Sequence, residues 1–335
     1  MGKYLIRRIL TSILILTVVA LMLYLILRAL PTSYVEAMAK ERASLPGAKS
    51  YQQWLLQLNT IYGLDCGVLE GFWHWIGQAC RGNFGDSWYF NLPVTVKFTQ
   101  VIGYSICLCT LGFFLELAVA IPLGMKAARR RYTLTDFALT MLALIGLSMP
   151  AFFFATLLKW IFAIELPWLP LFGAVSRYHQ TYSPLLQFLD LARHFILPLI
   201  TFVLVGVGGI LRFTRANMLE VLDADYIRAA RARGINEKQI HRNHALRNIL
   251  LPLITIAGSA LPGLFSGALL IETLFQIPGI GWTAYQAMVA GDIPFSMFYL
   301  LLIAALTLLG SLAADICYGL ADPRVRIRGR EIGHA

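Results

Sequence analysis

Long apolar runs limit what this chain can fold into more than any other feature of its sequence. Runs of about 18 or more apolar residues are long enough to cross a bilayer as helices. We expect six such spans, at residues 9–27, 101–123, 137–163, 195–210, 253–275 and 297–320. Because 58% of the 335 residues are hydrophobic and 14% are charged, an ordinary soluble domain is excluded. The sequence therefore predicts an all-α membrane protein with six transmembrane helices.

Two of these runs need a further argument. The fourth is interrupted by Pro198, Gly206, Gly208 and Gly209, but neighbouring helices can satisfy backbone groups that such residues leave unpaired. The first has the basic start and apolar run of a secretory signal. It is longer than a typical signal, and no small-residue cleavage site precedes Pro31, so we expect it to be retained as a span.

Basic residues set the expected orientation. They cluster at the two termini, between the second and third spans, and in the long polar stretch after the fourth. The clusters outside that stretch are Lys3, Arg7, Arg8, Lys126, Arg129, Arg130, Arg131, Arg324, Arg326, Arg328 and Arg330. All fall on one side of a six-span chain, and the positive-inside rule makes that side, with both termini, cytoplasmic. The formal charge of +10 is then explained by contact with membrane lipid rather than by nucleic-acid binding.

The spacing of the spans predicts four parts. Residues 1–30 form a tail and the first helix, residues 31–100 an extracytoplasmic subdomain, residues 101–322 the core, and residues 323–335 a basic cytoplasmic tail. A stretch as long as 31–100 is expected to fold rather than merely connect. Its aromatic residues either lie in the membrane interface or form the subdomain's own core, and we expect the core for those far from a span. They are Trp54, Trp73, Trp75, Trp88 and Tyr89.

Two cysteines, Cys66 and Cys80, lie in this external stretch, whereas Cys107, Cys109 and Cys317 lie in spans. An oxidising compartment would allow a disulfide between the first two. Two separate thiols are equally consistent with the sequence, which does not give their distance. Their spacing fits no zinc pattern.

The longest polar stretch of the chain runs over residues 223–252. In it Arg228, Ala229 and Ala230 are followed by Gly234, which predicts a short helix with a bare face that ends at a left-handed glycine. A second helical segment over residues 237–248 carries Lys238, Arg242 and Arg247 on one side. Periodicity leaves two interpretations open: a surface onto which another protein docks, or a basic amphipathic helix lying on an anionic leaflet.

This stretch resembles the loop shared by membrane subunits of ATP-binding-cassette importers. The matching residues are Ala229, Ala230, Gly234, Ile249, Leu251 and Pro252. Arg228 stands where the general pattern has Glu, and the gap after Gly234 is longer; both departures are usual in the peptide-importing branch. The resemblance implies a coupling helix, within a cytoplasmic loop at 213–251, that docks into the ATPase. Its residues are Tyr226, Arg228, Ala229, Ala230, Arg231, Ala232 and Gly234.

Further segments resemble the same family in the same order. They lie at residues 62–65, 82–87, 93–94, 121–124, 146–152, 271–281, 315–318 and 322–326. The chain is thus similar to the permease subunits of peptide importers over nearly its whole length. The resemblance implies the type I importer permease fold, a peptide substrate and a heterodimer with a second homologous permease. It also implies two ATPase subunits and an extracytoplasmic substrate-binding protein.

Charged residues inside spans cost at least about 2.5–3.5 kcal/mol at a helix centre, so each needs a role. Glu116 either lines the translocation path and meets a substrate ammonium group, or pairs structurally. Lys159 is expected to reach the interface or pair, and Glu272 and Asp315 to make structural hydrogen bonds. Small residues Gly263 and Gly267, at a spacing of four, predict a face for helix packing.

No residue pattern predicts catalysis, a metal or a cofactor in this chain. Residues 47–50, the nearest approach to a phosphate-binding loop, lack the required glycines, so ATP and Mg belong to partner subunits. His241 and His244 alone make a weak metal site. Nickel chelates or oligosaccharides are alternative substrates for the same architecture. An intramembrane enzyme using Glu116 or Asp315 is a further alternative, but no paired acid and base or nucleophile is apparent.

Overall fold

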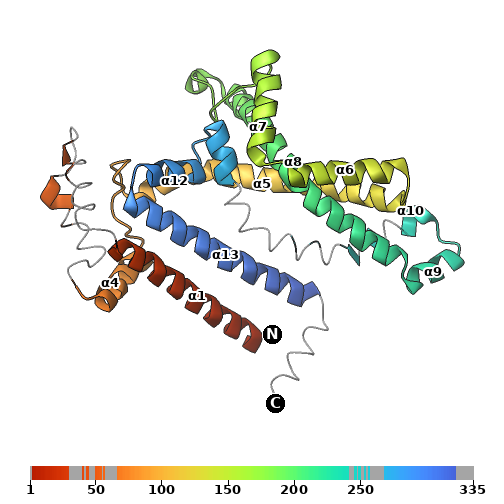
Figure 1. The fold of residues 1–335 in the computed structure, drawn as a ribbon, viewed down its shortest axis with the longest axis horizontal. Helices are drawn as coiled ribbons and strands as arrows, with labels where there is room; N and C mark the ends of the chain where they lie inside the picture. Colours follow the sequence, from red (N-terminus) through yellow and green to blue (C-terminus); the bar gives the residue numbers. More distant parts are fainter. Residues whose placement is uncertain are drawn as a thin grey trace. The chain divides into compact units, whose positions relative to one another are not determined.

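The computed structural model describes residues 2–29, 66–240 and 268–321, with residues 40, 43–44, 50–54, 56, 245–246, 248–249, 253 and 256. The named elements in these ranges are helices (Figure 1). The long ones are α1 (Gly2–Ala29), α5 (Val94–Arg129), α8 (Pro184–Leu222) and α13 (Ile293–Ala321). The others are α4 (Val68–Cys80), α6 (Leu134–Ser148), α7 (Ala151–Lys159), α9 (Asp225–Ala232), α10 (Glu237–Gln239) and α12 (Ile280–Val289), with a π-helical turn at Trp160–Glu165 and a 3-10 turn at His179–Thr181.

Four of these helices, α1, α5, α8 and α13, are long and apolar enough to cross a membrane. A fifth span is formed if α6 and α7 are counted together, although they are bent by 101°. The predicted fifth span, 253–275, lies largely outside the described residues, and residues 268–275 of it are helical. The all-α membrane fold is therefore confirmed, and the helices are consistent with about six spans.

The third predicted span, 137–163, is wrong as one continuous helix. It is divided at Met149 and Pro150 into two helices, α6 and α7. Figure 1 shows α7 turning sharply away from α6. Proline lacks a backbone N–H and pushes the preceding residue out of helical conformation. Met149 accordingly has φ −91° and ψ 132°, which is extended backbone.

The fourth predicted span, 195–210, is much too short. α8 has 39 residues, with Ser183 at its N-cap and Pro184 in its first turn. Pro198 lies inside the helix and does not end it. The extra segments at both ends contain charged residues among apolar ones, which is why an apolar run alone did not include them. Those ends carry the contacts that matter below.

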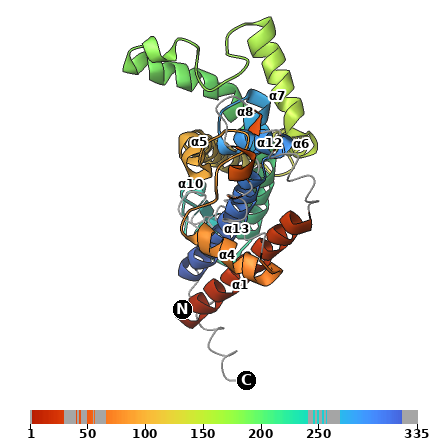
Figure 2. The ribbon, with the colours of Figure 1, turned by 90° about the vertical axis from the view of Figure 1, so that its left-hand side faces the viewer.

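The residues divide into two compact units, and each is described separately. One comprises Gly2–Gly103 and Gly279–Leu309. Its core contains Trp54, Trp75 and Trp88, packed with Tyr24 of α1 and Met297 of α13. In both views α4 lies beside α1 (Figures 1 and 2).

Trp54, Trp75 and Trp88 therefore share their core with α1 and α13 rather than forming one alone, which corrects the expectation for these aromatic residues. Trp73 and Tyr89 do not belong to that core and are 62% and 41% exposed. The buried Asp292 ties the stretch down: its carboxylate accepts hydrogen bonds from the hydroxyl of Ser87 and from the backbone N–H of Tyr89, at 3.0 Å for the latter.

The other unit comprises Met1, Tyr104–Pro278 and Gly310–Ala335. Its centre is α8, which packs along α6 and α7. The helices approach closely because glycines face backbone: a Cβ added to Gly208 would lie 2.4 Å from the carbonyl oxygen of Ala143. Close approach of this kind is what small residues permit between membrane helices. The predicted packing residues Gly263 and Gly267 lie outside the described residues.

Candidate functional site: a capped polar helix and its anchors

The polar stretch folds as predicted at its start, into the short helix α9 (Asp225–Ala232). Two of its residues, Ile227 and Ala230, are buried at 0% and 7% exposure. They belong to one apolar cluster with Met218 and Leu222 of α8 and with Ile240. Burial of one stripe of the helix therefore fixes α9 to the end of α8.

Gly234 ends α9 in the way that the sequence predicts. Its φ is +78°, in the left-handed region that favours glycine. The N–H of Gly234 donates to the carbonyl of Arg231 at 2.9 Å, and the N–H of Ile235 donates to the carbonyl of Ala230 at 3.3 Å. These two bonds make a Schellman motif, in which the last carbonyls of the helix are satisfied without a bulky side chain.

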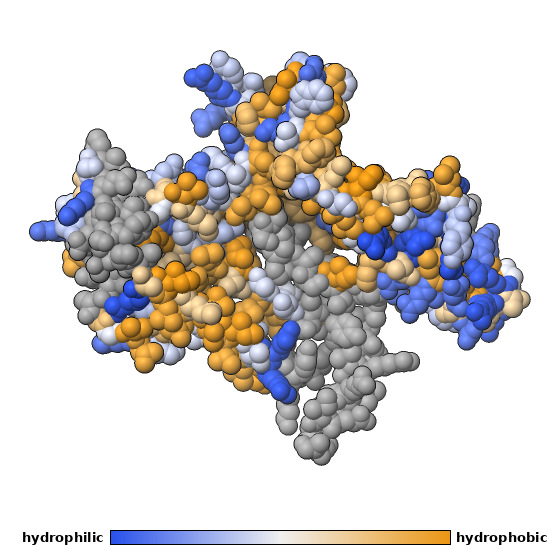
Figure 3. Space-filling model, viewed as in Figure 1, coloured by the Kyte–Doolittle hydropathy of each residue, from blue (hydrophilic) through white to orange (hydrophobic). Residues whose placement is uncertain are grey.

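The opposite stripe of α9 is exposed and small. Ala229 and Ala232 are exposed there, between the exposed side chains of Arg228 and Tyr226. Figure 3 shows hydrophilic residues gathered over α9 and α10, at the end of the apolar surface of this unit. The bare face predicted from the two alanines is thus present, with the exposed Asp225 one turn earlier on the same stripe.

Polar contacts hold the flanking side chains of α9 in place. Arg231 donates from Nε to Glu237 at 2.7 Å and from a guanidinium nitrogen to the carbonyl of Leu222 at 3.5 Å. Arg228 pairs with Asp225 at 3.2 Å, and Asn248 donates to the hydroxyl of Tyr226 at 2.8 Å. The exposed pair of Arg228 contributes little stability, because solvent screens it. Arg231 contributes more to position, since it ties α9 to both α8 and α10.

The second predicted helical segment, 237–248, is described only in part. α10 covers Glu237–Gln239, and Ile240 and Ala245 are fully buried in the same cluster as α9. The side chain of Lys238 and residues Arg242 and Arg247 lie outside the described residues, as do His241 and His244. The basic face predicted from them stays a prediction.

An ion pair that sequence reasoning missed anchors this end of α8. Arg215 of α8 donates from two nitrogens to the carboxylate of Asp136 on α6, at 2.6 and 2.8 Å. The same carboxylate accepts the backbone N–H of Tyr132 at 3.0 Å. The Asp136 side chain is only 6% exposed. The sequence feature that could have indicated this pair is the position of Asp136, an acid at the edge of an apolar run and shortly after a basic cluster.

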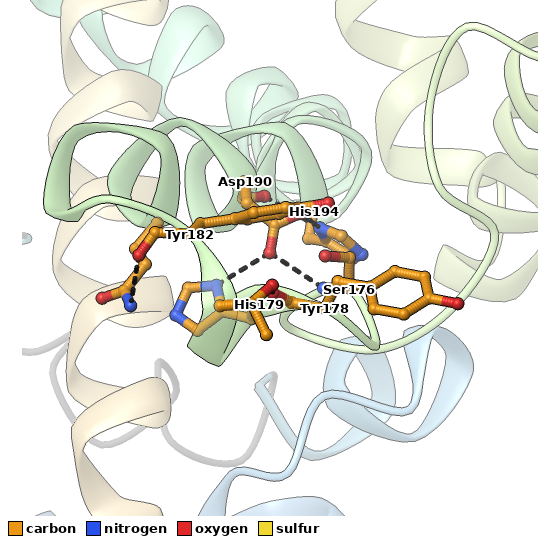
Figure 4. Close-up of polar contacts among 8 residues, drawn as sticks. Ser176, Tyr178, His179, Tyr182, Asp190 and His194 are labelled. Carbon is orange, nitrogen blue, oxygen red and sulfur yellow. Dashed lines mark hydrogen bonds and ion pairs between the residues drawn. The ribbon is translucent and has the colours of Figure 1, made fainter.

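A second acid, Asp190, organises the opposite end of α8 (Figure 4). Its carboxylate accepts the backbone N–H of Ser176 at 2.9 Å and lies 2.8 Å from Nδ1 of His179. Nδ1 of His194, four residues along the helix, lies 2.8 Å from the backbone oxygen of Asp190. The sequence offered only the spacing of Asp190 and His194 as a signal. Within the described residues, no group of three His, Cys, Asp or Glu is arranged to hold a metal ion.

Glu116 of α5 is buried, at 7% exposure, against α8. A Cβ added to Gly206 would lie 2.3 Å from the carboxyl carbon of Glu116, so the glutamate occupies the space that this glycine leaves. None of the described residues donates a hydrogen bond to its carboxylate. Glu116 is therefore enclosed between two helices in this conformation.

Two other charged residues of the spans, Lys159 and Glu272, have polar partners. Lys159 donates to the carbonyl of Leu274 at 2.8 Å and lies 4.2 Å from the ring centroid of Phe172. Glu272 accepts a hydrogen bond from Ser105 at 2.6 Å. Both agree with the structural roles expected for them. The side chain of Asp315 lies outside the described residues.

Of the two alternatives left open for Cys66 and Cys80, the structure has the separate thiols and not the disulfide. Cys80 is the last residue of α4, and Cys66 precedes that helix. Residues at the two ends of a 13-residue helix are separated by about 20 Å, given a rise of about 1.5 Å per residue. A disulfide needs α-carbons within about 7 Å. The helix between them is thus the reason that they do not meet.

Long apolar helices, with a short polar helix fixed to the end of one of them, define an all-α membrane protein. The chain belongs to the family described as binding-protein-dependent transport system inner membrane component, whose profile matches residues 120–327. The match includes α9, the Asp136–Arg215 pair and the whole of α8. The resemblance noted from the sequence is thereby confirmed.

Relatives of known name extend the match to nearly the whole chain. The oligopeptide transport system permease protein AppB of Bacillus subtilis is 32% identical over 326 residues, which are 97% of this chain and 99% of that protein. The probable peptide ABC transporter permease protein y4tP of Sinorhizobium fredii is 34% identical over 326 residues, which are 97% of this chain and 100% of that protein.

A solved structure shows the same fold at low sequence identity. The inward-facing MetNI methionine ABC transporter contains a chain that superposes with a TM-score of 0.52 at 16% identity. The superposition covers 68% of this chain and 97% of that one. At this identity the likeness concerns the fold alone.

Proposed function

We propose that this chain is one of two permease subunits of an importer of di- or oligopeptides, and that α9 couples it to an ATPase. The relatives named above carry the names of oligopeptide or peptide permeases and match this chain over nearly their full length. This match supports the substrate class. Nickel chelates and oligosaccharides are the alternative substrates. The ligand bound by the partner substrate-binding protein is the observation that would decide among them.

The observation that carries the coupling proposal is the shape of α9. A helix that enters a cleft of another protein must present a slim surface, and Ala229 and Ala232 provide one. The Schellman cap at Gly234 turns the chain away without adding bulk. A helix that only rested on lipid would instead expose large apolar side chains. On α9 the apolar Ile227 is turned inward and fully buried.

Coupling also requires that a push on α9 reaches the spans. Ile227 and Ala230 fix α9 to the apolar cluster at the end of α8, and Arg231 ties it to the carbonyl of Leu222. Arg215 then fixes α8 to Asp136 of α6. We infer that closure of two ATPase subunits around bound ATP moves α9, α8 and α6 together, which is the rigid-body type of switching motion.

The same proposal sets the topology and the partners. The basic clusters support a topology with both termini and the 213–251 loop in the cytoplasm and residues 31–100 outside, by the positive-inside rule. The partners are a second, homologous permease, two ATPases and an extracytoplasmic substrate-binding protein. The chain itself supplies no ATP chemistry. Reaction of a cysteine placed at position 237 with an impermeant reagent in intact cells would contradict this topology.

The test of coupling is Gly234→Trp in the reconstituted complex. A left-handed φ of +78° is strained for any L side chain, and Trp adds bulk beside the bare face. We expect uptake and substrate-stimulated ATP hydrolysis to fall, while membrane insertion and recognition of the binding protein persist. Gly82→Trp is the matched control, because Gly82 has φ +75° and equally open surroundings. Unchanged uptake and hydrolysis in Gly234→Trp would show that the loop is not the coupling element.

Glu116 is the residue that we propose for the translocation path, with its carboxylate meeting a peptide ammonium group. Because it is enclosed against Gly206, a path can reach it only when α5 and α8 separate. Glu116→Gln keeps the shape and removes the charge. Uptake of peptides should fall in this variant, with uptake of amino-terminally acetylated peptides unaffected. If the variant took up free and acetylated peptides as well as the wild type does, Glu116 would be a packing residue only.

A further inference from the structure

A hollow of about 500 Å³ lies on the surface of α6 and α8, and it shares one residue, Arg215, with the anchor described above. Its volume is within the range of about 300–1,000 Å³ that is usual for sites of small organic ligands. Apolar residues form most of its lining, with two arginines and a threonine. The lining residues are Thr140, Leu147, Gly209, Arg212, Phe213, Arg215 and Ala216.

Gly209 opens this hollow. A Cβ added to Gly209 would meet no atom within 4 Å, whereas one added to the adjacent Gly208 would lie 2.4 Å from the carbonyl oxygen of Ala143. Gly208 therefore serves the packing of α8 on α6, and Gly209 does not. The space beside Gly209 is left open by the chain's own fold, so a side chain placed there would fill it without moving either helix.

The hollow is apolar at one end and cationic at the other. Leu147 lies beside Gly208 of α8: a Cβ added to Gly208 would be 2.9 Å from the Leu147 side chain. Seven residues further along α8, Arg215 meets Asp136 at the beginning of α6. Arg212 lies between these two levels. Along the two helices the lining thus passes from leucine and glycine to arginine.

Arg212 is the arginine that is available at the cationic end. Both donating nitrogens of Arg215 are engaged by Asp136, whereas Arg212 is exposed and pairs with no acid among the residues that the structure describes. Charged side chains at membrane depth need an opposite charge or access to the interface. An anion on Arg212 would satisfy this need.

The position of Arg212 along the chain indicates which anion. Residues 195–211 of α8 contain no charged residue, and Arg212 is the first after them. In a spanning helix that boundary lies near the level of the lipid headgroups, where arginine attracts anionic lipid. With the proposed topology the boundary faces the cytoplasmic leaflet.

We propose that this hollow binds an anionic phospholipid of the cytoplasmic leaflet, with its phosphate on Arg212 and an acyl chain beside Gly209, Phe213 and Leu147. A single charge at one end of an apolar hollow complements an amphiphile with one anionic head. A second permease subunit would need a broader and more varied surface. The proposal goes beyond peptide import and uses only its topology.

The experiment is native mass spectrometry of the purified, assembled complex, titrated with phosphatidylglycerol and separately with phosphatidylcholine. Three variants are compared with the wild type. Arg212→Gln removes the cation, Gly209→Leu fills the hollow, and Gly103→Leu is the control, because Gly103 is an exposed glycine of α5 with equally open surroundings. Thermal midpoints of all four proteins in the same detergent check that each variant is folded.

We expect the wild type to retain phosphatidylglycerol more tightly than phosphatidylcholine. Arg212→Gln should weaken phosphatidylglycerol binding about tenfold, as expected for loss of one charge-assisted hydrogen bond, and remove the preference. Gly209→Leu should weaken binding of both lipids, and Gly103→Leu neither. If Arg212→Gln and Gly209→Leu both retained phosphatidylglycerol as tightly as the wild type does, the proposal would be overturned. Dissociation of the second permease from Gly209→Leu with its lipid binding unchanged would also overturn it, and would assign the hollow to a protein interface.

Discussion

The two ends of α8 are anchored by the same arrangement with different bases. At one end Asp136 accepts the N–H of Tyr132 and two bonds from Arg215; at the other Asp190 accepts the N–H of Ser176 and lies against His179. The acids are similarly buried, at 6% and 11% side-chain exposure. The base is a planar arginine that donates from two nitrogens at the α9 end and a histidine that makes one contact at the other.

The chain separations differ as well. Asp136 and Arg215 are 79 residues apart and join two helices, whereas Asp190 binds residues 11 and 14 positions earlier in the loop before its own helix. The α9 end is thus where separate helices are locked together. At the other end, Asp190 holds the loop before its own helix. The difference accords with the proposed coupling, in which force from a partner would enter at the α9 end.

The largest expected effect is from breaking the arginine anchor. Arg215→Met leaves the buried carboxylate of Asp136 without its counter-charge, which costs about 3–5 kcal/mol for a pair of this kind. The thermal midpoint of the purified complex should fall markedly, and coupled ATP hydrolysis should be lost with it. Adding Asp136→Leu to Arg215→Met should restore most of the thermal stability. If Arg215→Met alone melts like the wild type, the pair does not hold α8 to α6.

A smaller effect is expected from the helix contact next to that anchor. Gly208→Ala places a methyl group 2.4 Å from the backbone oxygen of Ala143, so α8 and α6 must separate at a cost of about 1–3 kcal/mol. Gly209→Ala meets nothing and should be neutral, or stabilising by up to about 1 kcal/mol, because alanine favours helix. Thermal midpoints of the two variants provide the comparison. Equal midpoints would show that the helices are not packed as described.

A still smaller loss should follow removal of the tie between α9 and α8. Arg231→Gln cannot reach both Glu237 and the carbonyl of Leu222, but Ile227 and Ala230 stay buried. Uptake should fall a few-fold while basal ATP hydrolysis of the assembled complex is retained, because association survives and transmission weakens. Arg131→Gln, which removes an exposed pair with Asp223 outside α9, is the control for loss of charge. Equal uptake in the two variants would argue against a role for the tie.

The smallest effect is expected at the histidine end. His179→Gln leaves Asp190 with the N–H of Ser176, so about 0.5–1.5 kcal/mol is lost at most. Limited proteolysis should cut the loop before α8 faster in this variant, with stimulated ATP hydrolysis close to wild type. Loss of hydrolysis comparable to that in Arg215→Met would mean that the two ends are equivalent, which contradicts the comparison above.

Much of this fold is predictable from apolar runs and short polar signals. The helices and the membrane class follow from run length, and the cap of α9 follows from one glycine after a helical pair of alanines. The ends of α8 do not, because an apolar run stops at the first charged residue although the helix continues past it. The break at Pro150 was predictable from proline chemistry and was missed, because the apolar run continues through it.

The anchors of the site could not be predicted for a different reason. Asp136 and Arg215 belong to elements far apart in sequence, and nothing local to either indicates the other. The same is true of Lys159 and the carbonyl of Leu274, which are 115 residues apart. Pairings of this kind depend on helix packing, and the packing depends on glycines whose neighbours only the structure shows.

The central claim is that the exposed face of α9 contacts an ATPase, and photocrosslinking tests it most directly. A photoreactive amino acid is placed at Ala229, in the middle of the bare face, and separately at Leu185, which is 69% exposed at the opposite end of α8. After irradiation of the assembled complex in membranes, we predict an adduct between this chain and the ATPase from position 229 and none from position 185. Adducts from position 229 that contain only lipid, in a complex that still carries its ATPases, would contradict the account.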